Sequence, residues 1–199
     1  MPRIERLHPG HAPALLSFER ENRAYFAATI PDRGDDFFAR FDALLGERLA
    51  EQATGEAQFH VVVDDTGAVL ARVNLVDVAH GSADLGYRVA ERATGRGLAT
   101  AAVREMCALA ASAYGLNTLR ARTTADNGAS RTVLARTGFL VTGEIDLNGR
   151  PGLGFSRELS PVGPVGSIGP AGFPAAGAVL PAGRAAVQES GSTAGLIGD

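Results

Sequence analysis

The sequence predicts an α/β (α+β) domain, in which a mixed, mostly antiparallel central sheet of about six to seven strands has helices on both faces. Three observations support this prediction. Strand and helix patterns alternate over residues 1–160, turn sequences separate consecutive strand runs, and in the second half a strand leads through a glycine-rich loop into an amphipathic helix. Alternation of the two element types implies helices packed on the faces of one sheet.

The first half of this segment is expected to begin with a strand, continue with two helices and end in a hairpin. The turn sequence Asp64–Gly67 lies between two apolar, β-branched runs and predicts the hairpin. Apolar residues at helical spacing predict the helices. The expected elements are a strand at 4–7, helices at 12–25 and from 35 to 49, and strands at 59–63 and 69–78.

The second half is expected to supply the remaining strands and two further helices. Leu85, Tyr87 and Val89 alternate with polar residues or glycine, which is typical of a half-buried strand. Asn148-Gly149 is a hairpin-turn sequence. The expected elements are strands at 84–89, 118–123, 139–147 and 153–159, and helices at 98–114 and 129–136.

Composition excludes several classes of protein. The formal net charge of −3 argues against a nucleic-acid partner, because no basic footprint is present. Cys107 is the single cysteine, so an internal disulfide framework is excluded. No apolar run approaches the roughly 20 residues that span a bilayer, and the charged start does not resemble a signal peptide. We therefore expect a cytoplasmic protein without a membrane partner.

Composition changes sharply near Ser160. More than half of residues 161–199 are Gly, Pro or Ala, and Phe173 is their one aromatic residue. Such a segment buries too little apolar surface to offset the entropy of ordering it. We therefore expect one domain over 1–160 and a disordered Gly/Pro/Ala-rich tail over 161–199.

The most informative segment joins the strand at 84–89 to the helix that begins at Leu98. Its loop holds Gly95 and Gly97, and glycine lets an anion approach the backbone closely. The first turn of a helix has unpaired N–H groups and a partial positive charge, which together favour phosphate. Arg92 and Arg96 could add charge-assisted bonds. The pattern indicates a phosphate-binding loop.

Three other interpretations compete for this loop. A P-loop needs Gly-Lys-Ser/Thr, which is absent. A dinucleotide fingerprint needs a third small residue where Thr100 stands, and it belongs in an early βαβ unit. A glycine turn that merely precedes a core helix remains open on the residues of the loop alone.

Three blocks together resemble the GCN5-related N-acetyltransferase (GNAT) family. Arg92-x-x-Gly95-x-Gly97-x-Ala99 resembles the Q/R-x-x-G-x-G/A signature of that family. The strand Asp84–Val89 is similar to the one that precedes this signature. Asn127–Phe139 resembles the block N-x-A-S-x-x-V-L-x-x-x-G-F, in the version found among ribosomal-protein N-terminal acetyltransferases. The N-terminal half matches the family only in pattern.

The resemblance implies the GNAT fold, in which the strand of Tyr87 splays from the next strand and acetyl-CoA enters the opening. It also implies a set of cofactor contacts, with backbone groups near Arg88 and Val89 on the pantetheine and the loop on the pyrophosphate. A plain helix N-cap remains the alternative for Asn127. The implied cofactor residues are Arg88, Val89, Arg92, Gly95, Arg96, Gly97, Leu98, Ala99, Thr100, Asn127 and Ser130.

The resemblance leaves the catalytic groups less defined. Many family members place a Tyr, the acid for the departing thiolate, where this chain has Leu134. The ribosomal-protein subgroup offers Ser130 instead, with a helix-capping serine as the alternative. Asp84 is a candidate base. Tyr87 is a further catalytic candidate, with packing in the wall of the cleft as its alternative. Water could also accept the proton, because an α-amine with a pKa near ~8 is already partly neutral. The four histidines show no metal-ligand spacing, so no metal is expected.

These observations predict an acetyl-CoA-dependent N-acetyltransferase that modifies a protein N-terminal α-amine or a small-molecule amine. The expected partners are acetyl-CoA and that amine. A homodimer is a candidate oligomeric state. A coenzyme A-binding module without transferase activity is the alternative, because the family's Tyr is missing. A nucleotide-phosphate-binding protein is a weaker alternative, since the Walker pattern is absent.

Overall fold

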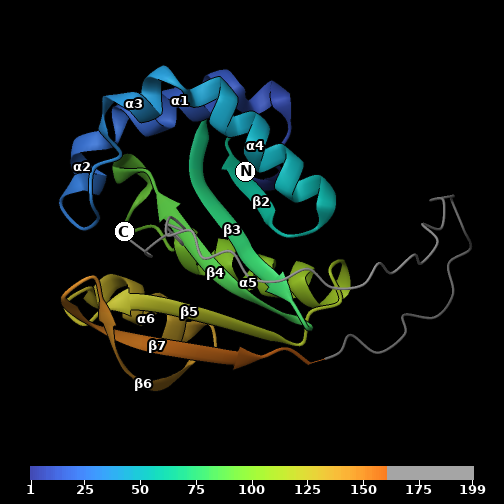
Figure 1. Cartoon of the computed structure of the whole chain (residues 1–199), viewed down its shortest axis with the longest axis vertical. Coiled ribbons are helices and arrows are strands. Elements are labelled where there is room, and N and C mark those ends of the chain that lie inside the picture. Colours follow the sequence, from blue (N-terminus) through green and yellow to red (C-terminus); the bar gives the residue numbers. More distant parts are fainter. Residues whose placement is uncertain (161–199) are drawn as a thin grey trace, which may run out of the picture.

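The sheet has seven strands in the order β1-β2-β3-β4-β5-β7-β6 (Figure 1), in a computed structural model that describes residues 1–160. The strands are β1 (Arg3–Arg6), β2 (Gln58–Val63), β3 (Val69–Ala79), β4 (Ser82–Val89), β5 (Thr118–Thr124), β6 (Leu140–Leu147) and β7 (Arg150–Glu158). The α-helices are α1 (Ala12–Glu21), α2 (Arg23–Ala27), α3 (Gly34–Ala39), α4 (Phe41–Thr54), α5 (Leu98–Ser112) and α6 (Gly128–Arg136). Two short 3-10 helices are η1 (Pro9–His11) and η2 (Glu91–Ala93). The tail expected over 161–199 lies outside the described residues.

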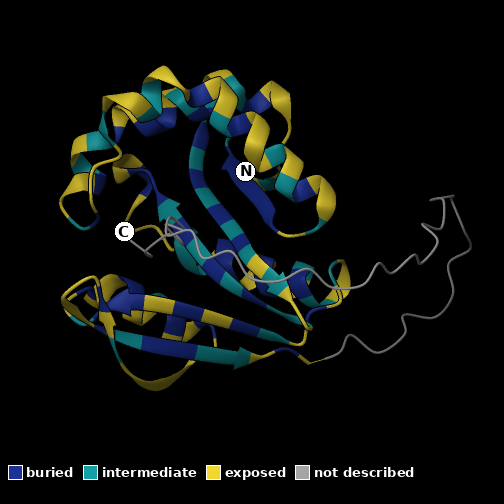
Figure 2. Cartoon of the chain, in the orientation of Figure 1, coloured by how far each residue is buried: buried dark blue, intermediate teal, exposed yellow. Residues whose placement is uncertain are grey.

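The helices form two layers, one on each face of the sheet. Helices α1 to α4 lie together over β2, β3 and β4, and α5 and α6 lie on the opposite side (Figure 1). Exposed residues gather on the outer surfaces of the helices, and buried ones face the sheet (Figure 2). Along β4 the buried Leu85, Tyr87 and Val89 alternate with half-buried Asp84, Gly86 and Arg88. The predicted fold class is confirmed, including a sheet that is mostly antiparallel.

The sheet is split between β4 and β5. These two strands are parallel and pair only where Ser82–Asp84 meets Thr118–Arg120. Beyond that point β4 continues along β3 as far as Val89, and β5 continues along β7 as far as Thr124. The two strands therefore diverge toward their C-terminal ends, and Figure 1 shows the resulting V between them.

Two predicted helices are each broken into two, which corrects the sequence-based boundaries. The helix expected over 12–25 is interrupted at Asn22, where φ is −103° and ψ is 9°. The buried Asn22 amide donates to the Phe18 carbonyl at 2.8 Å and accepts from the Glu91 N–H at 2.9 Å. This side chain ties the end of α1 to the segment just after β4, and an unbroken apolar pattern gives no sign of it. The second predicted helix is interrupted at Arg40, where the backbone angles are similar: φ is −104° and ψ is 14°.

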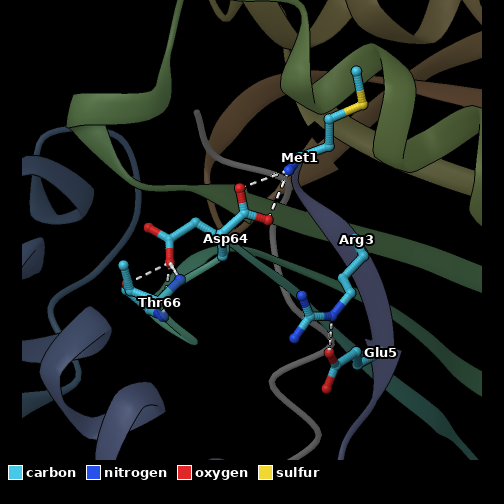
Figure 3. A network of polar contacts seen from close by, with 7 residues as sticks. Met1, Arg3, Glu5, Asp64 and Thr66 are labelled. Atoms are coloured by element: carbon cyan, nitrogen blue, oxygen red, sulfur yellow. Dashed lines mark hydrogen bonds and ion pairs between the residues drawn. The ribbon is translucent and has the colours of Figure 1, made fainter.

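The start of the chain is held to the β2–β3 hairpin by polar contacts (Figure 3). The amino group of Met1 donates to Asp65 Oδ1 in the hairpin turn at 2.7 Å, while within β1 Arg3 Nε donates to Glu5 Oε1 at 2.6 Å. Within the hairpin turn, Asp64 Oδ1 accepts from the Thr66 N–H at 2.9 Å and from its hydroxyl at 2.6 Å. An aspartate that bonds its own downstream backbone stabilises a tight turn. The turn predicted at Asp64–Gly67 is confirmed.

Among the described residues, no helix combines the length and the apolar character needed to cross a bilayer.

Candidate active site

The glycine loop opens directly into α5, as the phosphate-binding interpretation requires. Gly95 and Gly97 have φ values of 73° and 78°, in the left-handed region that favours glycine. Gly97 is the N-cap residue of α5, and no side chain caps this end. The first backbone bond of the helix runs from the Ala101 N–H to the Gly97 carbonyl at 3.0 Å. The N–H groups of Leu98, Ala99 and Thr100 precede that bond, so they point out of the helix end.

The remaining predicted cofactor residues are spread around this loop. Arg96 is exposed within it and forms no ion pair inside the described part of the chain. Arg92, on η2, donates instead to the Val69 carbonyl at 3.4 Å. Val89 ends β4 on the α5 side, and the side chain of Arg88 lies on the opposite face, against α1. A coenzyme contact at Arg88 therefore has to come from its backbone.

Tyr87 of β4 and Ser130 of α6 meet where these two elements pack together. The Tyr87 hydroxyl lies 3.0 Å from Ser130 Oγ, and either atom could be the donor. Asn127 caps α6, because its side-chain oxygen accepts from the Ser130 N–H at 2.9 Å. Ser130 is fully buried. The structure thus brings together three residues that the sequence separated, and it shows the capping role of Asn127 beside any contact with coenzyme.

Asp84 does not join this group. Its position on β4 differs from that of Tyr87 by an odd number of residues, so the two side chains leave opposite faces of the sheet. Its carboxylate lies where β4 and β5 still pair, and it binds Arg120 Nε at 2.7 Å and a terminal nitrogen of Arg122 at 2.8 Å. Both carboxylate oxygens therefore have partners on β5.

A charged cluster that the sequence analysis missed lies on the same face as Arg88. Glu19 on α1 is 2% exposed, and its carboxylate is paired with Arg72 of β3. Arg33 and Arg88 lie 3.8 and 3.7 Å from the other carboxylate oxygen. Burial alone would raise the pKa of Glu19, but the guanidinium groups of Arg72, Arg33 and Arg88 lower that pKa below its ordinary value. Glu19 is thus a charged group at neutral pH.

A signal for part of this cluster was present in the sequence. Arg72 and Arg88 interrupt apolar strand runs at positions that share one face, and an arginine there needs a partner. Their direct pairing across β3 and β4 depends on the strand register, and Glu19 and Arg33 come from distant segments. No local pattern connects the four residues.

A cavity of about 240 Å³ lies at the wide end of the V, next to the last residue of β5. The segment between α2 and α3 forms one wall, and the β6–β7 turn forms the other. Arg150 of β7 ties the two walls together, because it donates to the Thr29 carbonyl at 3.0 Å and pairs with Asp126 at 3.1 Å. The lining residues are Ala27, Ala28, Thr29, Ile30, Pro31, Thr124, Leu147, Asn148 and Arg150.

One group of potential metal ligands occurs among the described residues, far along the sequence from this opening. Ligand atoms of Glu5, His8 and His11 all lie within 4.8 Å of one another. Their hydrogen bonds account for the arrangement, since His8 and His11 form a capping box on η1 and His11 Nε2 lies 3.1 Å from Glu5 Oε2. Sequence spacing did not reveal this group, and it shares no residue with the candidate active site.

Comparisons with known proteins fit this geometry. The family model described as "Acetyltransferase (GNAT) domain" matches residues 3–140. That match covers well over half of the 199 residues, so the chain belongs to the GNAT acetyltransferase family. The comparison with curated proteins found no match.

Solved structures of acetyltransferases share the fold. Ribosomal-protein-S5-alanine acetyltransferase from Vibrio fischeri has a TM-score of 0.75 at 21% identity, over 79% of this chain and 93% of the other. Mycobacterium smegmatis RimJ in complex with CoA-disulfide has a TM-score of 0.71 at 24% identity, over 79% and 81%. Spermidine N-acetyltransferase from Vibrio cholerae, in complex with CoA and spermine, has a TM-score of 0.66 at 16% identity, over 80% and 96%.

Proposed function

We propose that this protein transfers the acetyl group of acetyl-CoA to a primary amine, either a protein N-terminal α-amine or a small-molecule amine. The observation that carries the proposal is the parting of β4 and β5 immediately before the uncapped first turn of α5. An opening of this kind admits a long, narrow ligand, and its end presents N–H groups to phosphate. The solved acetyltransferases with bound CoA support the assignment.

The chemistry divides between the two ends of the opening. The loop Gly95–Thr100 would hold the pyrophosphate, and backbone groups at Arg88 and Val89 would bond the pantetheine. The neutral amine attacks the thioester carbonyl carbon, a tetrahedral oxyanion forms, and its collapse breaks the C–S bond and releases the CoA thiolate. We expect water to take the amine proton, since both oxygens of Asp84 are engaged by arginines.

The function is tested by incubating the full chain with acetyl-CoA and a panel of amines while free CoA thiol is detected. We expect acetyl-CoA at about 100 times its Kd to stabilise the fold by about 2.7 kcal/mol, whereas ATP and NAD have no effect. Binding of acetyl-CoA without release of thiol on any amine would favour the non-catalytic binding module. The variant Gly97→Val should raise the Michaelis constant for acetyl-CoA, because Val is strained at this left-handed position and its side chain would crowd the phosphate.

The acid for the departing thiolate is proposed to be Ser130, whose hydroxyl proton passes to the thiolate sulfur. Tyr87 then passes its proton to Ser130 through their hydrogen bond, and water returns a proton to Tyr87. Leu134 stands where the family's Tyr would be, and its apolar side chain is fully buried. A thiol pKa near ~8.5 lets the thiolate leave without help but more slowly. Positioned acid catalysis contributes about 10²–10⁴-fold, so Ser130→Ala should lower turnover within that range and leave acetyl-CoA affinity nearly unchanged.

Tyr87→Phe is the matched variant, because it removes one hydroxyl from the same pair. It should lower turnover less than Ser130→Ala does. The reverse order would make Tyr87 the acid. If Ser130→Ala weakens acetyl-CoA binding while turnover is kept, the serine is a cofactor contact.

A further inference from the structure

The cluster around Glu19 carries more positive than negative charge. Three guanidinium groups, those of Arg33, Arg72 and Arg88, surround the single Glu19 carboxylate. Arg33 and Arg88 line a small hollow beside Glu19. Arg23 also lines it, but Asp32 and Asp35 each pair with Arg23 at 2.6 Å and compensate its charge. Two of the three positive charges around Glu19 are therefore uncompensated.

Arg33 and Arg88 are the two with unused hydrogen-bonding capacity. Neither guanidinium donates a hydrogen bond to any described residue, because the Glu19 oxygen is 3.8 Å from Arg33 and 3.7 Å from Arg88. A guanidinium has five N–H donors and binds a carboxylate through two parallel bonds. Arg72 is paired with Glu19 and serves mainly to hold it. The arrangement leaves two forks available to one anion.

The hollow that these forks line lies next to the cavity at the end of β5. Arg33 is 33% exposed, and Arg88 packs over Phe26 at 5.4 Å. The hollow and the cavity at the end of β5 share Ala27, Ile30 and Pro31 as lining residues. The hollow itself measures only about 10 Å³, room for about one water molecule, so a carboxylate would bind at its mouth, beside the cavity.

We propose that the acceptor is an amine that carries a carboxylate, and that Arg33 and Arg88 bind this carboxylate while the amine faces the opening between β4 and β5. This inference rests on the acetyl transfer proposed above and specifies its substrate class. Burial, together with the neighbouring guanidinium groups, lowers the pKa of both arginines. A bound anion would stabilise their charged forms and so oppose this lowering. A polyamine, which carries only positive charge, would be repelled from the same place.

The inference is tested on the full chain with acceptors matched in pairs, and release of free CoA thiol is measured. The pairs are an amidated Ser-Asp-Ala peptide with its Ser-Asn-Ala counterpart, and a free amino acid with its amide; spermidine is the cationic acceptor. Charge-assisted bonds predict at least about tenfold higher kcat/KM for the carboxylate member. A difference only between the peptides identifies an acidic N-terminus, and one only between the amino acids identifies a free α-carboxylate.

The outcomes separate this inference from the function on which it rests. Turnover that is equal within the pairs, or highest for spermidine, overturns the inference and leaves acetyl transfer standing. Acetyl-CoA binding without turnover on any amine overturns both.

The variant Arg33→Gln tests whether the preference for carboxylate-bearing acceptors arises in this hollow. It should bring the kcat/KM ratio within a pair toward one, mainly through KM for the acidic acceptor. Arg40→Gln is the control, since Arg40 is an exposed arginine outside the hollow, 3.9 Å from Glu47. A melting curve confirms that each variant is folded. An unchanged ratio in folded Arg33→Gln overturns the assignment.

Discussion

The two faces of the sheet bury their ionisable groups in opposite ways. On the α5 side the buried groups are uncharged, since burial lowers the pKa of His60 to about 4 and raises the pKa of the Cys107 thiol. On the α1 side the most deeply buried acid, Glu19, is held in its charged form by three arginines. One face is an ordinary core, and the other is a core with an ion cluster inside it.

This difference explains why the proposed selection of acceptors by charge is assigned to the α1 side. A neutral buried group needs at most a hydrogen bond, as His60 finds in the Tyr114 hydroxyl at 2.9 Å. A buried charge needs partners, and the arginines in excess around Glu19 form the carboxylate site proposed above. The loop Gly95–Thr100 works differently again, because backbone N–H groups at a helix end attract phosphate without any buried side chain.

The largest expected effect on stability comes from neutralising the charged face. Glu19→Gln leaves Arg72 and Arg88 buried without their counter-charge, and losing one partner of a buried pair costs about 3–5 kcal/mol. Urea unfolding followed by circular dichroism at pH 7 would measure this loss. Because the excess positive charge grows, added chloride should restore part of the stability.

Asp84→Asn provides the matched comparison within the same sheet. Asp84 also binds two arginines, Arg120 and Arg122, but their side chains are 51% and 44% exposed. Exposed ion pairs contribute about 0–1 kcal/mol each, so this variant should lose far less than Glu19→Gln. Equal losses in the two variants would contradict the contrast drawn between a carboxylate with buried arginine partners and one with exposed arginine partners.

The sequence was sufficient where chemistry and spacing are local. The glycine loop, the helix from Leu98 and the turn at Asn148-Gly149 are each defined by a few consecutive residues, and all three are confirmed as backbone structure, whereas the phosphate-binding role of the loop stays a prediction. Both turn residues have positive φ, 55° and 83°, as an Asn-Gly hairpin turn requires. The Tyr87–Ser130 contact was not predicted, although both residues were candidates, because it depends on how α6 packs against β4.

The charged cluster around Glu19 could not be predicted because its residues come together only through the fold. Asn22 breaks a helix in order to reach Glu91, and Glu19 meets Arg72 and Arg88 only once the β3–β4 register is set. Helix periodicity reports which residues are apolar. It carries no information about which arginine a buried glutamate will find.

The pH dependence of stability tests the contrast from the α5 side, where the buried groups are neutral. His60 determines the direction of this dependence. In the folded state the pKa of His60 is about 4, against an ordinary value of 6.5. Burial is the main cause, Arg6 adds to it, and His60 Nδ1 has no hydrogen-bond partner among the described residues. Since the unfolded chain binds the proton more readily, the stability that His60 provides is complete above pH 6.5 and is lost as the pH falls toward 4.

The expected loss is about 3 kcal/mol in full, and more than half of it should occur by pH 5. Glu19 acts in a different window, because a carboxylate with a lowered pKa loses its contribution only as the pH falls below its ordinary value of 4.5. Unfolding free energies measured in urea at pH 7 and pH 5 therefore isolate the histidine. His60→Gln should flatten the pH dependence, whereas His80→Gln, at an exposed position, should leave it unchanged. If the unfolding free energy of His60→Gln still falls between pH 7 and pH 5, another group is responsible for the pH dependence. The loss could then not be attributed to a neutral group buried on the α5 side.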